Sequence, residues 1–155
     1  MARANRAIVY SQNGEPASVL RALTYPTLPP PPAGALTVRY LLAPVNPSDI
    51  NVVQGVYPAK PAPVSLTPSG VGSADEPVFV GGNEGVAEVT AIGAGVEGLR
   101  KGDWVIMAKQ QAGTWATQAS VEPQDVIRVE KAMEGFMDVH AATLTVRGSL
   151  FCIAR

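Results

Sequence analysis

The sequence is poor in the residues that build metal sites and disulfides: its 155 residues include one cysteine, Cys152, and one histidine, His140. A single cysteine cannot close an intramolecular disulfide or form a cysteine-based metal cage, so a reducing compartment is favoured. Because His140 has no second histidine or thiolate cluster to join it, we interpret it as a surface or interface residue of a helix.

An excess of charge and long hydrophobic runs are absent as well. The chain carries 12 Lys and Arg against 13 Asp and Glu, and its formal net charge is −1. Since no basic stripe is present to neutralise phosphates, nucleic acid is not an expected partner. Apolar runs such as Leu41–Val45 are far shorter than the roughly 20 residues that cross a bilayer, so no membrane span is expected.

Short apolar runs separated by glycine and proline predict a mostly β fold with short helices. We expect Ala7–Tyr10 and Val19–Leu23 to form an opening hairpin with its tight turn at Asn13-Gly14. The spacing of the later strands favours a small, partly open β-barrel. These later strands are predicted at residues 36–42, 86–92, 103–108, 114–121 and 126–129.

A short helix is predicted to begin after Asn46. Asn46 is a good N-cap, Pro47 suits the first helical position, and Asp49 lies near the positive end of the helix dipole. Gly55 is expected to end the helix. Residues 56–80 contain five prolines and are predicted to form a long loop, the kind of segment that often carries site residues.

Gly93, Gly95 and Gly98 match the spacing of the dinucleotide-binding fingerprint. In that fingerprint the glycines open a helix whose N-terminus faces the pyrophosphate. Here a turn and the strand predicted at 103–108 follow instead. We therefore interpret the glycines as part of a hairpin connection and not as a phosphate site.

Five sequence blocks occur in an order that resembles a known family. They are Ala43–Asn51, Gln54–Tyr57, Gly81–Val86, Val96–Ile106 and Gly113–Trp115. Together they resemble the medium-chain dehydrogenase/reductase superfamily, and within it the mitochondrial trans-2-enoyl-CoA (enoyl-[acyl-carrier-protein]) reductases. The resemblance extends over about residues 7–146. It implies a GroES-like, partly open β-barrel that lacks the Rossmann nucleotide-binding domain.

The resemblance also implies where the parts of the chain lie. Residues 1–140 would form the GroES-like substrate domain, and 141–146, within a helix predicted at 137–146, would begin the crossover helix to the cofactor domain. Arg147-Gly148 then stands where the family has an Asn-Pro pair. We expect 147–155 to be an aberrant or truncated tail, because nine residues cannot form the repeated βαβ units of a dinucleotide fold.

Tyr57 is the candidate catalytic residue that the resemblance implies. In the enoyl reductases NADPH delivers hydride to the β-carbon of an acyl thioester, and a tyrosine at the position of Tyr57 protonates the α-carbon. A phenol stays protonated at neutral pH and can donate to a developing enolate. From the loop alone, an aromatic side chain packing on the barrel is the more common explanation. The resemblance also implies that Asn46 lies near the nicotinamide end of the cofactor, besides its role as a cap.

The remaining polar and aromatic residues of these blocks are expected to be mainly structural. Zinc alcohol dehydrogenases of the superfamily carry a Cys where this sequence has Asn46 and a His where it has Asn83, so the resemblance implies no zinc. We interpret Asn83 and Glu84 as structural. Trp104 and Trp115 are expected in the barrel core because of their alternation and size.

The sequence therefore predicts the N-terminal half of an NADPH-dependent trans-2-enoyl-thioester reductase of mitochondrial fatty-acid synthesis, inactive alone, acting in the family on enoyl-CoA or enoyl-ACP. Much of the family's homodimer contact would be missing. The resemblance implies the mitochondrial matrix, although Arg3 and Arg6 form no clear presequence, which leaves the cytoplasm as the alternative. A zinc-free quinone-reductase-like fragment and a non-catalytic module that binds acyl groups or a partner remain alternatives. Whether the chain is an enzyme by itself stays open.

Overall fold

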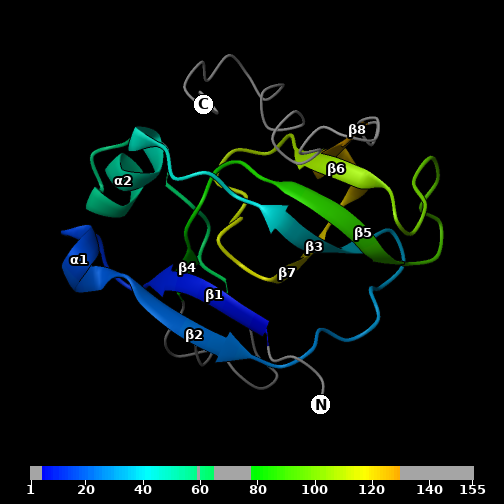
Figure 1. Cartoon of the computed structure of the whole chain (residues 1–155), viewed down its shortest axis with the longest axis horizontal. Coiled ribbons are helices and arrows are strands. Elements are labelled where there is room, and N and C mark those ends of the chain that lie inside the picture. Colours follow the sequence, from blue (N-terminus) through cyan, green and yellow to red (C-terminus); the bar gives the residue numbers. More distant parts are fainter. Residues whose placement is uncertain (1–4, 59, 65–77, 130–155) are drawn as a thin grey trace, which may run out of the picture. The chain divides into compact units, whose positions relative to one another are not determined.

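The computed structural model describes residues 5–58, 60–64 and 78–129, which form two compact units (Figure 1). The first unit draws on residues up to Thr27, on Pro44–Asn83 and on Gln111–Thr117. The second contains the remaining segments, Leu28–Ala43, Glu84–Gln110 and the chain from Gln118 onward. The chain therefore passes back and forth between the two units, and each unit has its own sheet.

The first unit contains a three-stranded antiparallel sheet in the order β2-β1-β4. Its strands are β1 (Asn5–Tyr10), β2 (Arg21–Tyr25) and β4 (Phe79–Val80). The first two strands pair as predicted, but the second strand lies at Arg21–Tyr25 and not at Val19–Leu23, and the tight turn at Asn13-Gly14 is wrong. The connection is longer and includes α1 (Pro16–Val19), because the Asn13 amide bonds carbonyls of another helix and does not close a turn.

Helix α2 (Pro47–Gln54) also belongs to the first unit and forms where the sequence predicts it. Asn46 precedes it in an extended conformation, with Pro47 in the first turn. Gly55 ends it in the left-handed conformation at φ 80°, which glycine adopts without a steric penalty. The side chains that α2 buries, those of Asp49, Val52 and Val53, share one face at helical spacing.

The long loop predicted over residues 56–80 is wrong at its end. Val64 and Val78 form a bridge, and Phe79–Val80 pairs with β1 as β4. Val78 is fully buried, Phe79 and Val80 are partly buried, and the Phe79 ring lies 5.3 Å from that of Tyr10. Residues 59 and 65–77 of the predicted loop lie outside the described residues.

The second unit is an open, antiparallel five-stranded sheet in the order β7-β3-β5-β6-β8 (Figure 1). The mostly β prediction is confirmed, with the described strands arranged as two open sheets and not as a closed barrel. Buried Leu, Val and Ala side chains form the core, and each fully buried Val or Leu contributes roughly 1.5–3 kcal/mol. The strands are β3 (Leu36–Leu42), β5 (Val86–Ile92), β6 (Trp104–Met107), β7 (Gln118–Val121) and β8 (Val126–Val129).

Three of these strands, β3, β5 and β8, have the predicted bounds. The strand predicted over residues 114–121 is too long, because its first half belongs to the first unit. There Ala116 bridges Ala7, and the Thr117 amide donates to the Arg6 carbonyl at 2.8 Å. Only the second half, β7, pairs with β3.

The glycine-rich segment after β5 is a hairpin connection, as predicted. Strands β5 and β6 pair antiparallel on either side of it. Gly93 packs against the segment before β3: its amide donates to the Ala35 carbonyl at 2.8 Å, and a Cβ on Gly93 would lie 1.9 Å from the Pro32 carbonyl oxygen. No helix follows these glycines within the described residues, so the fingerprint spacing reflects close backbone packing.

Several predictions fall on residues outside those described: the helix at 137–146 with His140, Cys152, and the tail at 147–155. Within the part of the chain that the structure covers, no helix has both the length and the apolar character needed to cross a membrane.

Replacing Gly93 by alanine tests this close packing. Gly93→Ala should lower the free energy of unfolding by about 3 kcal/mol, the upper end of overpacking costs, because its Cβ meets a backbone carbonyl that cannot rotate away. Gly95→Ala is the control: Gly95 has φ 79° and no atom within 4 Å of a Cβ, so only the backbone penalty of about 1–2 kcal/mol applies. Urea unfolding measures both, and equal losses would contradict the packing argument.

Candidate functional site around helix α2

The start of α2 is held by a side chain from its own first turn. One oxygen of Asp49, Oδ2, accepts a hydrogen bond from the Asn46 backbone amide at 2.7 Å, as part of a capping box. This bond satisfies a donor just outside the helix, and the carboxylate lies favourably near the positive end of the helix dipole. The predicted role of Asp49 at the helix start is confirmed, and Asn46 occupies the N-cap position as predicted.

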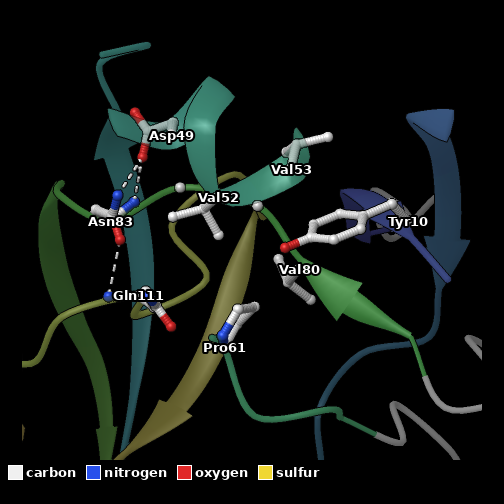
Figure 2. Close-up of a pocket in the computed structure, with 10 residues that line it drawn as sticks. Tyr10, Asp49, Val52, Val53, Pro61, Val80, Asn83 and Gln111 are labelled. Atoms are coloured by element: carbon white, nitrogen blue, oxygen red, sulfur yellow. Dashed lines mark hydrogen bonds between the residues drawn. The ribbon is translucent and has the colours of Figure 1, made fainter. Parts of the chain in front are cut away.

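Asp49 also ties α2 to two other segments of the first unit. Its second oxygen, Oδ1, accepts from the Asn83 backbone amide at 2.9 Å and from the Asn83 side-chain amide at 2.8 Å. The Asn83 carbonyl oxygen in turn accepts from the Gln111 backbone amide at 3.0 Å. Figure 2 shows this chain of bonds along one side of a small pocket. One carboxylate therefore organises the helix start, the loop after β4 and the loop after β6.

Gln111 occupies a costly backbone conformation. It is the only non-glycine residue with a positive φ among those described, at 55°. A left-handed conformation costs a non-glycine residue about 1–3 kcal/mol, and such outliers are concentrated at functional sites. Here the conformation accompanies the bond from the Gln111 amide to Asn83, so the network holds the strain in place. Nothing in the sequence around Gln111 signals this conformation.

Burial dominates the electrostatics of Asp49, whose exposed fraction is 2 %. Desolvation raises the pKa of the Asp49 carboxyl above its usual value. The hydrogen bonds from Asn46 and Asn83 stabilise the charged form and oppose that shift without cancelling it. The buried carboxylate is thus an energetically costly group, and its three N–H donors favour its charged form.

Trp115 is hydrogen-bonded to the segment that precedes α2. Its indole nitrogen donates to the Pro44 carbonyl at 3.0 Å, just before the helix, and its ring covers Gly81 and Gly82. A Cβ on Gly81 would lie 2.3 Å from ring atom Cε3. Any residue other than glycine at position 81 would therefore clash with the Trp115 ring. The expected core position is wrong: the ring is partly exposed because it lies over the glycine pair and reaches a carbonyl. Trp104 is also only partly buried, at the margin of the β5–β6 core.

At the far end of α2 the chain turns into Tyr57. The amides of Val56 and Tyr57 both donate to the Asn51 carbonyl, at 3.0 and 3.2 Å, just after left-handed Gly55. The Tyr57 backbone is therefore fixed while its side chain stays partly exposed. Asn46 and Tyr57, the two residues that the resemblance singles out, flank opposite ends of a helix about 12 Å long.

Tyr10 faces the pocket from β1. Its side chain is 1 % exposed, and its hydroxyl, which points into the pocket in Figure 2, has no hydrogen-bond partner among the described residues. Burial raises the pKa of Tyr10 to about 12. The cavity measures about 10 Å³, enough for about one water molecule and far below the roughly 300–1,000 Å³ of ligand pockets. A substrate-sized molecule does not fit there.

Sequence reasoning singled out Asn46, Asp49 and Tyr57 but missed that Asn83 and Gln111 extend the hydrogen bonds of Asp49. Asn83, interpreted as structural, is the link between Asp49 and Gln111. Glu84 follows it in the chain and is partly buried. Over the residues that the structure describes, no three His, Cys, Asp or Glu side chains gather in a way that could hold a metal ion.

Comparison with known proteins gives a consistent match. A family model described as the alcohol dehydrogenase GroES-like domain matches residues 32–131. The chain is 38 % identical, over 143 residues, to the mitochondrial enoyl-[acyl-carrier-protein] reductase of Schizosaccharomyces pombe, covering 91 % of this chain and 36 % of that protein. With the enzyme of the same description from Homo sapiens the identity is 42 % over 124 residues, covering 80 % of this chain and 29 % of that protein.

A solved structure agrees with the sequence match. The complex of Etr1p with NADP and crotonyl-CoA superimposes with a TM-score of 0.73 at 38 % identity, covering 82 % of this chain and 34 % of that chain. The chain thus spans about a third of the length of the proteins that it matches.

Because the pKa of Asp49 is raised, its contribution to the free energy of unfolding should depend on pH. Asp49→Asn should lower the free energy of unfolding at pH 7 by about 1–3 kcal/mol, because it loses an acceptor that faces N–H donors. Since the folded-state pKa lies above the unfolded one, the wild-type carboxyl contributes more stability as the pH falls through the folded pKa, and the gain is complete below about pH 4.

The difference in unfolding free energy between wild type and variant should therefore widen on acidification from pH 7 to about pH 4. Urea unfolding of both proteins across this range measures it, and subtracting the curves removes the carboxyls that the two share. A difference that stays constant would show that hydrogen bonding balances burial at Asp49, and one that narrows in acid would show that hydrogen bonding outweighs it; either result contradicts the prediction.

Proposed function

Since this chain belongs to the alcohol dehydrogenase GroES-like domain family, we propose that it is the substrate-side part of an NADPH-dependent trans-2-enoyl-thioester reductase in which Tyr57 donates the proton. The observation that carries the proposal is the placement of Tyr57 just after the glycine C-cap of α2, with a fixed backbone and an accessible side chain. The likeness to mitochondrial enoyl-[acyl-carrier-protein] reductases supports the choice of reaction.

The surroundings of Tyr57 suit a proton donor to an acyl group. Val56, its neighbour in the chain, is 70 % exposed and Tyr57 is partly exposed, so an apolar side chain and a phenol are both accessible in this turn. A proton donor needs an accessible hydroxyl at a defined place, and the turn after α2 supplies the defined backbone. The small pocket beside Tyr10 is excluded as the substrate site by its volume.

In the proposed reaction NADPH supplies the hydride that reduces the β-carbon of the thioester. Negative charge then develops on the α-carbon and the thioester oxygen. The Tyr57 hydroxyl transfers its proton to the α-carbon, completing the saturated acyl thioester, and the phenol recovers a proton from solvent. Donation of a hydrogen bond by the phenol before the transfer lowers the energy of the developing charge.

The described residues offer a contact for only a small part of NADPH. Asn46 is partly exposed at the start of α2, a place that fits a contact with the nicotinamide end. The Gly93–Gly98 turn does not fit the pyrophosphate, because β6 and no helix follows it. We therefore infer that the nucleotide-binding part corresponds to the portion of the relatives that this chain does not match, and that this chain alone is inactive. By the same likeness we place the whole protein in mitochondrial fatty-acid synthesis.

The test is NADPH-dependent reduction of crotonyl-CoA by this chain and by the chain extended with a relative's nucleotide-binding domain. We expect activity in the extended form only, and a loss of about 10²- to 10⁴-fold in kcat for Tyr57→Phe, the range for a general acid. Tyr40→Phe is the matched control, because it removes a phenol that contacts the Met107 sulfur in the second unit.

Other results would redirect the assignment. Activity in the short chain would overturn the inference that it needs the further domain. An extended, folded form that reduces quinones and is indifferent to Tyr57→Phe would favour the quinone-reductase-like alternative. Binding of acyl thioesters without turnover would favour the non-catalytic module.

A further inference from the structure

The last turn of α2 is bonded by a side chain about 40 positions earlier in the sequence. The Asn13 side-chain amide donates to the carbonyls of both Val52 and Val53, each at 3.1 Å, and the Gly14 amide also donates to Val53 at 3.1 Å. The last four carbonyls of a helix have no partner within the helix. The connection between β1 and α1 therefore acts as a C-terminal cap for α2.

The Asn13 side chain also packs against Gly55. A Cβ on Gly55 would lie 2.9 Å from Cγ of Asn13, so the amide group packs directly on the C-cap residue. Gly55 needs to be glycine for its left-handed φ of 80° and, independently, for the closeness of Asn13. Two separate constraints thus meet at the residue where the chain leaves the helix.

The candidate proton donor, Tyr57, lies in the turn that leaves the helix at Gly55. The amides of Val56 and Tyr57 share the Asn51 carbonyl, one turn back in the helix. A helix of eight residues has little stability of its own, and its last turn would fray without outside bonds. The Val52 carbonyl also accepts from the Gly55 amide at 3.0 Å, so loss of the Asn13 amide would remove one of the two donors at each carbonyl. We expect this loss to loosen the last turn, which carries the Asn51 carbonyl that holds the Tyr57 backbone.

We propose that Asn13 is a positioning residue that holds Tyr57 in place through the last turn of α2. The proposal rests on the proposed function for its catalytic meaning, whereas the coupling between Asn13 and the Tyr57 backbone stands on the geometry alone. Proton transfer is sensitive to displacements of about 1 Å, so loosening this turn lowers the rate without removing any reacting group.

Amide hydrogen exchange of this chain, followed residue by residue by NMR, tests the coupling. Asn13 is exposed, so Asn13→Asp and Asn13→Ala leave the core intact. Asn13→Asp keeps the size and shape but replaces the donor by an acceptor that faces two carbonyls. We expect exchange at Gly55, Val56 and Tyr57 to rise at least about tenfold more than at the core amides of β1.

Asn5→Ala is the matched control. Asn5 is also a side-chain amide that donates to a backbone carbonyl in the first unit, that of Pro26 at 3.0 Å, but it lies away from α2. Its loss should speed exchange by a common factor that follows global stability. If the Asn13 variants behave like this control, with no selective effect after α2, the positioning proposal is overturned.

A double-mutant cycle in the extended form tests the catalytic consequence. Asn13→Ala should lower kcat by about 10- to 100-fold with KM little changed, and should cause little further loss when Tyr57→Phe is already present. Additive losses would show that Asn13 does not act through Tyr57. If Tyr57→Phe alone has no effect, the proposed function fails, while the exchange experiment still decides the positioning of the Tyr57 backbone.

Discussion

The Asp49 carboxylate is the group on which the rest of the site depends. Removing a charge from water is costly, and this one keeps 2 % of its surface exposed while accepting three N–H bonds from two segments. Losing one of those donors leaves a buried charge short of a partner, which is more expensive than the bond is favourable. The segments of Asn46 and Asn83 are therefore held by the same two oxygens, and the Asn83 side chain joins the third segment by accepting from the Gln111 amide.

The two ends of α2 are fixed by different means. At its start, a carboxylate holds the helix: Asp49 accepts a hydrogen bond from the Asn46 amide, and the helix dipole favours a negative charge there. At its end, where a carboxylate would be unfavourable, the neutral amide of Asn13 donates to the last carbonyls. A short helix with so little stability of its own can still fix the backbone at Asn46 and Tyr57, because both of its ends are bonded to neighbouring segments.

Sequence patterns predicted the elements whose bounds are set by neighbouring residues in the chain. The bounds of α2 follow from a capping residue, an early proline and a left-handed glycine, and three strands follow from apolar runs between turn residues. The patterns gave wrong predictions where a side chain contacts a segment that is distant in the sequence. Asn13-Gly14 is a strong turn signal, yet Asn13 is bonded to α2, and Trp115 alternates like a core residue, yet it lies over two glycines. Such choices depend on partners about 30–40 positions away, which no local pattern contains.

Asn46 and Asn83 stand where the zinc-dependent members of the superfamily that this sequence resembles carry metal ligands. In this chain both residues donate to Asp49, and Asn83 passes the connection on to Gln111. A metal ion joins separate segments by attracting several ligands to one positive centre. Here the same segments are joined by several N–H donors that converge on one negative centre. The sign of the organising charge is therefore the reverse of that of a metal ion, and Tyr57, the proton donor proposed above, makes none of these hydrogen bonds to Asp49.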